Sequence, residues 1–207
     1  DKNGKIPNEI LFTAKLCGVL KIYCVGGAQA IAAMTFGTET IPKVYKIFGP
    51  GNQYVTVAKQ IATQHQVAID MPAGPSELLV VADQSANPAY VASDLLSQAE
   101  HGADSQVILV TTFPALLDQV RAAIASQIER LPRKDVANQA MVNSRMIAFE
   151  TDAEAIAFIN QYGPEHYVVC MENEALYLDQ ITNAGSVFIG NYTPESAGDY
   201  ASGTNHT

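Results

Sequence analysis

Short runs of β-branched and aliphatic residues alternate along the chain with longer amphipathic segments of helix length. This alternation is typical of βαβ units, in which helices cover a parallel sheet. Seven runs are predicted as strands: Ile22–Val25, Val44–Phe48, Leu78–Ala82, Gln106–Thr111, Met146–Phe149, Tyr167–Met171 and Ser186–Ile189. Several are apolar almost throughout, which indicates burial on both faces of a sheet. The pattern therefore predicts an α/β fold with parallel sheets.

Seven further segments are predicted as helices: Asn8–Leu16, Ala28–Phe36, Asn52–Gln64, Pro88–His101, Pro114–Leu131, Ala153–Gln161 and Glu174–Ile181. Pro88 and Pro114 stand at first helical turns, where proline is favourable. The stretch from Asp70 to Ser76 holds two prolines and a glycine and interrupts the rhythm of strands and helices. We expect a boundary there, with one lobe over residues 1–75 and a second over residues 76–207.

Composition and charge limit the classes of partner. Hydrophobic residues make up 48% of the 207, enough for a sizeable core, and the formal net charge is −9. An acidic chain without clustered Lys and Arg is poorly suited to bind nucleic acid, because its phosphates must be neutralised by basic side chains. No apolar run has the length of a membrane span, and we expect no signal peptide. The three cysteines lie in apolar segments without a CxxC motif, so we expect them to be structural, in a reduced, cytoplasmic compartment.

Two glycine-rich turns precede predicted helices. They are Val25-Gly26-Gly27-Ala28-Gln29 and Phe48-Gly49-Pro50-Gly51-Asn52. Such turns allow the backbone to approach a phosphate and direct a helix N-terminus at it. In the second turn, Tyr54 occupies the place of the third glycine in a dinucleotide fingerprint, so ordinary tight turns of an α/β protein are an open alternative.

A second candidate motif closes the helix predicted at Pro88–His101. Gln98 and His101 are three residues apart, so both would project from one helical face and grip one ligand. A histidine and an amide oxygen can bind a metal, although an amide is an uncommon zinc ligand. The alternative is a histidine placed favourably at the negative end of the helix dipole.

Two further segments carry groups suited to catalysis. In Gly163-Pro164-Glu165-His166, a glutamate and a histidine follow a rigid turn and offer two proton acceptors, although a solvated turn would have the same sequence. The loop from Pro194 to His206 is rich in Asp, Ser, Thr, Asn and His, and loops of this kind often carry function.

Together these segments resemble the histidinol dehydrogenases. The runs GGAQAIAA, FGPGN, IDMPAGPSE, DLLSQAEHG, GPEH and ESAGDYASGTNH stand in the order and rough spacing of that family. The resemblance covers nearly the whole chain, apart from residues 112–142. Six motifs in register are far more specific than any one of them.

The resemblance implies the following residue roles. Gln98, His101 and Asp199 match zinc ligands, Glu165 and His166 match the catalytic pair, and Gln29 and Asn52 match positions near NAD. Substrate contacts are implied for Ser76, Gln98, His101, His166, Asp199 and His206.

The resemblance also implies a fold, an assembly and a reaction. The family fold has two incomplete Rossmann-like lobes, of which the second would be incomplete in this chain. Its enzymes are homodimers, and a C-terminal tail donated by the partner supplies a zinc-binding histidine and a substrate-contacting glutamate. The reaction oxidises L-histidinol to L-histidine through an aldehyde with two NAD⁺ and a zinc ion (Zn²⁺). It belongs to histidine biosynthesis and needs neither nucleic acid nor membrane.

Two other functions stay open at this stage. One is a nicotinamide-dependent oxidoreductase that uses no metal. The other is a non-catalytic fragment that folds or binds cofactor without turnover. The chain begins at Asp1 and ends at Thr207, which look like the ends of a fragment. We therefore expect this chain alone to bind zinc weakly and to be inactive.

Overall fold

Strand β3 (Glu77–Ala82) is the centre of a parallel sheet in the computed structural model, which describes residues 4–70 and 76–202. The sheet has the order β5-β4-β3-β6-β7. The other strands are β4 (Gln106–Thr111), β5 (Arg145–Ala148), β6 (His166–Cys170) and β7 (Ser186–Ile189). The chain moves outward from β3 to one edge and then returns to build the other half, which is the order of a doubly wound sheet.

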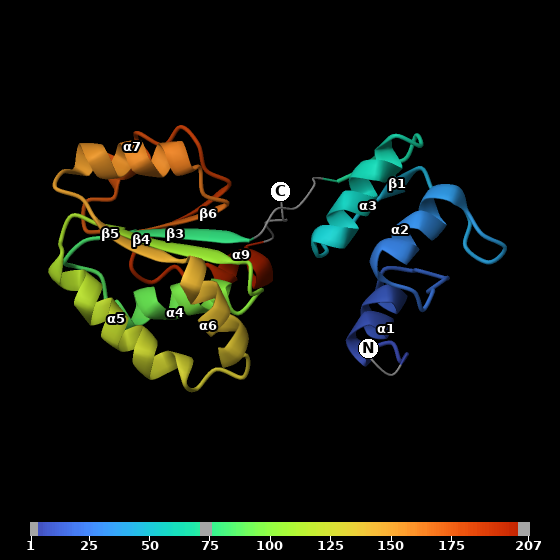
Figure 1. Cartoon of the computed structure of the whole chain (residues 1–207), viewed down its shortest axis with the longest axis horizontal. Coiled ribbons are helices and arrows are strands. Elements are labelled where there is room, and N and C mark those ends of the chain that lie inside the picture. The colour runs from blue at the N-terminus through green and yellow to red at the C-terminus, as the bar shows by residue number, and fades with distance from the viewer. Residues whose placement is uncertain (1–3, 71–75, 203–207) are drawn as a thin grey trace. The chain divides into compact units, whose positions relative to one another are not determined.

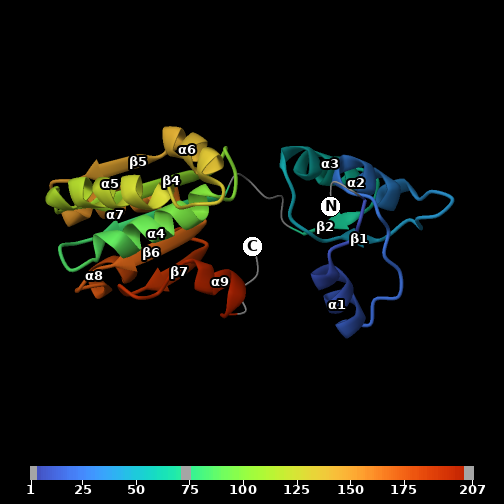
Figure 2. The same cartoon turned by 90° about the horizontal axis from the view of Figure 1, so that it is seen from below.

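Helices cover both faces of this sheet. Three lie on one face, α4 (Pro88–Ala99), α5 (Ala115–Ile128) and α6 (Lys134–Asn143), and α7 (Asp152–Tyr162) and α8 (Ala175–Leu178) lie on the other (Figures 1 and 2). A short helix, α9 (Ser196–Tyr200), follows β7.

The alternation of side chains along β3 divides the core in two. Leu78, Val80 and Ala82 pack with α4, α5 and α6. Leu79 and Val81 pack with α7 and α8. All five side chains are fully buried, which explains why this strand is apolar throughout. The α/β class with parallel sheets is confirmed.

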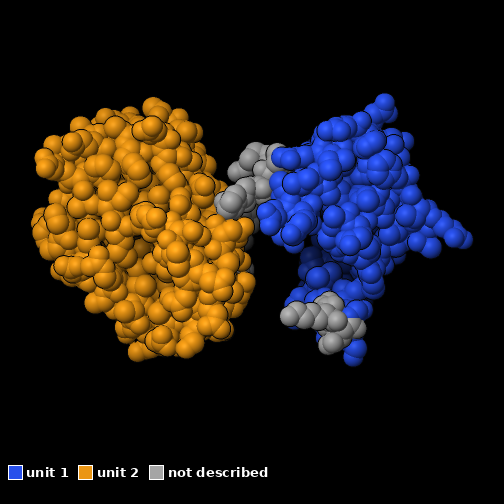
Figure 3. All heavy atoms as spheres, in the orientation of Figure 1, with its two compact units in different colours: residues 1–74 blue, residues 75–207 orange. Residues whose placement is uncertain are grey.

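Residues 1–74 and 75–207 form two separate units (Figure 3). The first contains α1 (Asn8–Leu16), α2 (Gly27–Phe36), β1 (Lys46–Ile47), α3 (Gln53–Thr63) and β2 (Ala68–Ile69). Its buried core consists of Ile31, Ile47, Ala62 and Val67. Most of the segment expected to separate the two lobes, Met71–Pro75, lies outside the described residues.

The first unit also corrects one strand prediction. Residues 22–25 form no strand, and Ile22, Tyr23 and Val25 are exposed. A β-branched run becomes a strand only where another strand pairs with its backbone, and within residues 4–70 the sheet consists of β1 and β2. No helix in the described part of the chain is long and apolar enough to cross a membrane.

Candidate active site

The residues of two separate motifs meet where strands β3 and β6 begin. The strands are parallel and register pairs Leu78 with His166, so their first residues lie at the same edge of the sheet. Ser76 immediately precedes β3, and Glu165 immediately precedes β6. Register therefore brings Ser76, Glu165 and His166 together at the amino ends of these two strands, which we call the amino edge. Ligands of open α/β sheets usually bind at the opposite side, beyond the carboxyl ends of the strands.

Backbone groups of Glu77 hold both members of the predicted catalytic pair. The Glu77 amide donates a hydrogen bond to Glu165 Oε2 at 3.2 Å. The Glu77 carbonyl oxygen lies 3.3 Å from His166 Nδ1. A carbonyl oxygen can only accept, so Nδ1 carries a hydrogen, and in the neutral ring the free lone pair is then on Nε2. The buried His166 ring is thus oriented as a base that acts through Nε2.

Glycine is required at two positions that support the backbone of this pair. Gly163 ends α7 in the left-handed region, at φ 64°, which favours glycine. A Cβ at Gly185 would lie 2.5 Å from the Glu165 carbonyl oxygen. The Ser186 amide donates to that same oxygen at 2.8 Å, which fixes the Glu165 backbone against the start of β7.

The end of α4 presents a buried amide without a partner. Gln98 is 1% exposed, and neither its Oε1 nor its Nε2 forms a hydrogen bond. An unsatisfied buried polar group costs about 1–3 kcal/mol, so such groups are rare in folded proteins. The helix ends at Ala99, so His101 lies in the turn that follows it and is exposed.

Helix α9 is attached to α4 beside this amide. Glu195, 2% exposed, accepts a hydrogen bond of 3.0 Å from Ser97 Oγ. Burial raises the pKa of Asp94 to about 6; a hydrogen bond from the Glu195 amide opposes this rise, and the Glu195 charge adds to it. These contacts bring the segment that carries Asp199 to the helix that carries Gln98. The side chain of Asp199 and all of His206 lie outside the described residues.

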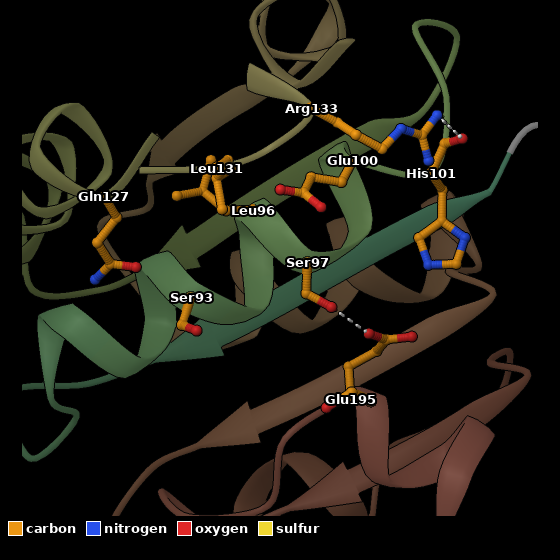
Figure 4. Close-up of a pocket in the computed structure, with 10 residues that line it drawn as sticks. Ser93, Leu96, Ser97, Glu100, His101, Gln127, Leu131, Arg133 and Glu195 are labelled. Carbon is orange, nitrogen blue, oxygen red and sulfur yellow. Dashed lines mark hydrogen bonds between the residues drawn. The ribbon is translucent and has the colours of Figure 1, made fainter. Parts of the chain in front are cut away.

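A cavity of about 510 Å³ opens beside these contacts (Figure 4). Its polar lining includes Ser97, Glu100, His101, Arg133 and Glu195. The Arg133 guanidinium donates to the His101 carbonyl oxygen at 3.5 Å, and the Ser97–Glu195 hydrogen bond crosses from α4 to the start of α9. Among the described side chains, no three His, Cys, Asp or Glu residues gather in a group that would hold a metal. The cavity thus presents two glutamates, one arginine and one imidazole, and Gln98 is not among the residues that line it.

The predicted cofactor residues lie on the first unit, at the starts of two helices. Asn52 caps α3, since its Oδ1 accepts hydrogen bonds from the amides of Tyr54 and Val55 at 3.1 and 3.2 Å. Gln29 is in the first turn of α2, whose N-cap is Gly26 and has no side-chain cap. The first amides of α2 therefore point outward without a capping side chain, which is the arrangement that binds phosphate.

A buried lysine stabilises the second glycine-rich turn. Lys59, 3% exposed, donates to the Gly49 carbonyl oxygen at 2.8 Å and forms an ion pair with Asp70. Asp70 Oδ2 accepts from the Gly49 amide at 2.6 Å. This amide first, and then Lys59, lower the pKa of Asp70. Both backbone groups of Gly49 are therefore held by side chains from α3 and from the residue after β2.

Sequence reasoning did not identify Glu77, Glu195 or the Lys59–Asp70 pair. Glu77 directly follows Ser76 in the sequence, and Glu195 opens the last motif, so their proximity to predicted residues was visible. No local pattern showed that Glu77 reaches residues 88 and 89 positions away.

Comparison with known proteins places the chain in a family. The family model described as histidinol dehydrogenase matches residues 1–207. The chain belongs to the histidinol dehydrogenase family. It is 58% identical over 207 residues to histidinol dehydrogenase from Bacteroides thetaiotaomicron, covering all of this chain and 48% of the relative. It is 58% identical over 203 residues to that from Salmonella typhimurium, covering 97% of this chain and 47% of the relative.

A solved structure agrees with this family and with the fold. The crystal structure of histidinol dehydrogenase from Elizabethkingia anophelis superposes with a TM-score of 0.90 at 63% identity, over 96% of this chain and 46% of that one. The chain thus spans about half the length of the histidinol dehydrogenases that it matches.

Proposed function

We propose that this chain is the part of a histidinol dehydrogenase that oxidises L-histidinol to L-histidine through an aldehyde, with NAD⁺ as the hydride acceptor. The single observation that carries the proposal is the pairing of Glu165 with His166 at the amino edge, each held by a backbone group of Glu77. Family membership supplies the substrate and the pathway, histidine biosynthesis.

In this proposal the two side chains act in sequence. His166 Nε2 removes the alcohol proton as the first hydride leaves, because Nδ1 is committed to the Glu77 carbonyl. Glu165 then accepts a proton from the water that adds to the aldehyde, and His166 assists the second oxidation. Ser76 lies next to Glu77 at the start of β3, where it would contact the substrate, and His206 would contact it from the last loop.

The residues at the end of α4 fit a zinc ion. The buried Gln98 amide has no hydrogen-bond partner, as expected of a side chain whose partner is a metal ion. Gln98, His101 and Asp199 would hold the ion. Bound zinc would supply a template that holds the imidazole and amine of histidinol and presents the alcohol carbon to the nicotinamide. Histidinol is cationic, so a chain with net charge −9 would attract it.

The first unit is the proposed NAD-binding lobe. The open amides of α2 would bind phosphate, and Gln29 and Asn52 would contact the cofactor beside the two glycine-rich turns. We further place the enzyme in the cytoplasm as a homodimer, with the zinc site completed by the partner's C-terminal tail.

A chimera tests the proposal directly. This chain would replace the matching half of Bacteroides thetaiotaomicron histidinol dehydrogenase, to which it is 58% identical. We expect two NAD⁺ reduced per histidinol and loss of turnover on chelation. Chelator-insensitive oxidation would favour the metal-free oxidoreductase instead, and no oxidation by a folded chimera would contradict the proposal.

Zinc binding by the 207-residue chain alone is the second test. Three protein ligands, one of them a neutral amide, make a weak site when the family's further histidine comes from a partner. Loss of a residue that only hydrogen-bonds to a metal ligand commonly costs about 10–100-fold in metal affinity. The absence of a ligand itself should therefore cost at least as much. Calorimetric titration should show weak binding that His101→Ala weakens further. Nanomolar binding abolished by His101→Ala would show that the chain holds a complete site.

A further inference from the structure

Glu195 is a buried acidic residue at the start of α9, and the mechanism above gives it no role. It is 2% exposed, although it is the N-cap of a helix of only five residues. Within residues 4–70 and 76–202, no lysine or arginine forms an ion pair with it. A buried carboxyl group without an ion pair is stabilised by hydrogen bonds. The donor to that carboxyl group therefore indicates what Glu195 does.

The donor is a serine near the end of α4. Ser97 Oγ donates to Glu195 Oε2 at 3.0 Å, and the Glu195 side chain points from α9 toward α4 (Figure 4). A serine within a helix often donates to a carbonyl oxygen of its own preceding turn instead. The hydroxyl has one hydrogen, so its donation to Glu195 commits Ser97 to a residue 98 positions away.

This hydrogen bond joins the two segments that carry proposed zinc ligands. Ser97 immediately precedes Gln98, whose buried amide has no hydrogen-bond partner. Glu195 stands four residues before Asp199, which lies in α9. The Gly198 amide donates to the Glu195 carbonyl oxygen at 2.9 Å, so Glu195 also belongs to the turn that leads to Asp199. One contact thus links the end of α4 to the turn that carries Asp199.

A segment as short as α9 needs such an anchor. A helix of five residues is not stable by itself, because its few internal hydrogen bonds do not offset the entropy of ordering it. A metal ligand on an unanchored segment has to be ordered when the metal binds, and this ordering lowers the affinity. An anchored segment presents its ligand already in place.

We propose that Glu195 is a positioning residue for the zinc site. By accepting the hydrogen bond of Ser97, it holds α9 against α4, so that Asp199 and Gln98 can bind one ion. Glu195 does not bind the ion itself. The effect on zinc rests on the proposed function, whereas the attachment of α9 through Ser97 does not.

Zinc affinity of the chimera, measured by competition with a chelator, tests the role of Glu195. Glu195→Ala should weaken zinc binding by about 10–100-fold, the usual loss for a residue that supports a metal ligand. Glu195→Gln keeps the length of the side chain and an oxygen that can accept from Ser97, so it should bind zinc nearly as tightly as the unsubstituted chimera. Equal losses in the two variants, or no loss in Glu195→Ala, would overturn the proposal.

Ser97→Ala removes the same hydrogen bond from the other side. It is the smaller change, and it keeps the test valid if Glu195→Ala does not fold. We expect it to weaken zinc binding as well, and the double variant to lose little more than the weaker single variant, because both changes remove one interaction. Fully additive losses would contradict the proposal. Ser93→Ala is the matched control, since Ser93 lies one turn earlier on α4, lines the same cavity and is exposed. Its affinity should be unchanged.

Hydrogen exchange of the 207-residue chain without metal measures the attachment by itself. The α9 amides should exchange faster in Glu195→Ala and Ser97→Ala than in the unsubstituted chain and Glu195→Gln, while the β3 amides stay protected in all four. Unchanged α9 exchange in both weakened variants would overturn the proposal.

Failure of the proposed function would look different. A folded chimera that neither binds zinc nor oxidises histidinol would refute the proposed function, and the role of Glu195 toward zinc with it. A chimera that does both, but binds zinc as tightly with Glu195→Ala, would refute only the role of Glu195.

Discussion

The two units position their candidate sites by different means. In the second unit, five consecutive β3 side chains are fully buried, and the sheet register itself brings Ser76, Glu165 and His166 together. In the first unit, α1 contains no buried residue, the core has four members, and the glycine-rich turn is held by the Lys59–Asp70 ion pair. A site built on a central sheet is held in place by packing, whereas a site on a unit with a small buried core depends on a few polar contacts.

The largest expected effect would test the site that the sheet positions. In the chimera, His166→Asn should slow both half-reactions by about 10²–10⁴-fold, because each hydride departure needs a base. Glu165→Gln should slow aldehyde oxidation more than alcohol oxidation, since it acts on water. Single-turnover measurements from histidinol and from the aldehyde would separate the two steps. Equal losses in both steps for Glu165→Gln would count against the assigned roles.

The next effect concerns the polar contacts of the first unit. Lys59→Met leaves Asp70 and the Gly49 carbonyl oxygen without their charged partner, and should cost this unit about 1–3 kcal/mol of unfolding free energy. Urea unfolding followed by hydrogen exchange of unit 1 amides would measure the loss. The exposed Lys21→Met is the control and should change little. Equal stability of the two variants would show that the core, rather than the ion pair, supports the turn.

The same pair predicts an acid sensitivity confined to the first unit. The pKa of Asp70 is lowered on folding by the Gly49 amide and then by Lys59. Ionised Asp70 therefore stabilises the folded first unit at pH values above the ordinary aspartate pKa. That contribution is lost as the pH falls through the lower, folded pKa. Unit 1 amides should therefore lose protection over this acidic range in the wild-type chain and much less in Asp70→Asn. An identical acid profile in the two chains would contradict the prediction.

An opposite pH dependence is expected in the second unit. Burial raises the pKa of Asp94 to about 6 on folding, so its stabilising contribution is present at low pH and falls as the pH rises from about 4 to about 6. Asp94→Asn should remove this dependence and stabilise unit 2 at neutral pH by about 1–3 kcal/mol. Thermal unfolding at pH 4 and pH 8 measures it, with the exposed Asp179→Asn as the control.

The smallest effect is expected at the cysteines. Cys170 is buried in β6, and burial first, then the charges of Asp94 and Asp83, raise the pKa of its thiol to about 12, so it is no thiolate nucleophile. Cys17 and Cys24 are exposed, contrary to the apolar surroundings expected from the sequence. Serine at any of the three should leave turnover of the chimera largely in place. A loss of several orders of magnitude at one of them would place a thiol in the reaction.

Sequence pattern determined most of the second unit. The strands predicted at Leu78–Ala82 and Gln106–Thr111 correspond closely to β3 and β4, because strands buried on both faces are continuous apolar runs. The same criterion failed at Ile22–Val25, where an apolar run found no strand to pair with. Six short motifs also sufficed to indicate the family, because side-chain identity at spaced positions is directly visible in a sequence.

Tertiary structure alone decided how the candidate site is built. The sequence shows Gln98 and His101 three residues apart, but only folding shows that the helix ends between them, leaving a buried amide and an exposed imidazole. The sequence shows Glu77 beside Ser76. It does not show that the Glu77 backbone reaches Glu165 and His166, because parallel strand pairing joins residues almost ninety positions apart. Local patterns indicate which face of an element is buried, whereas a histidine tautomer or an unsatisfied amide depends on neighbours that only the tertiary fold supplies.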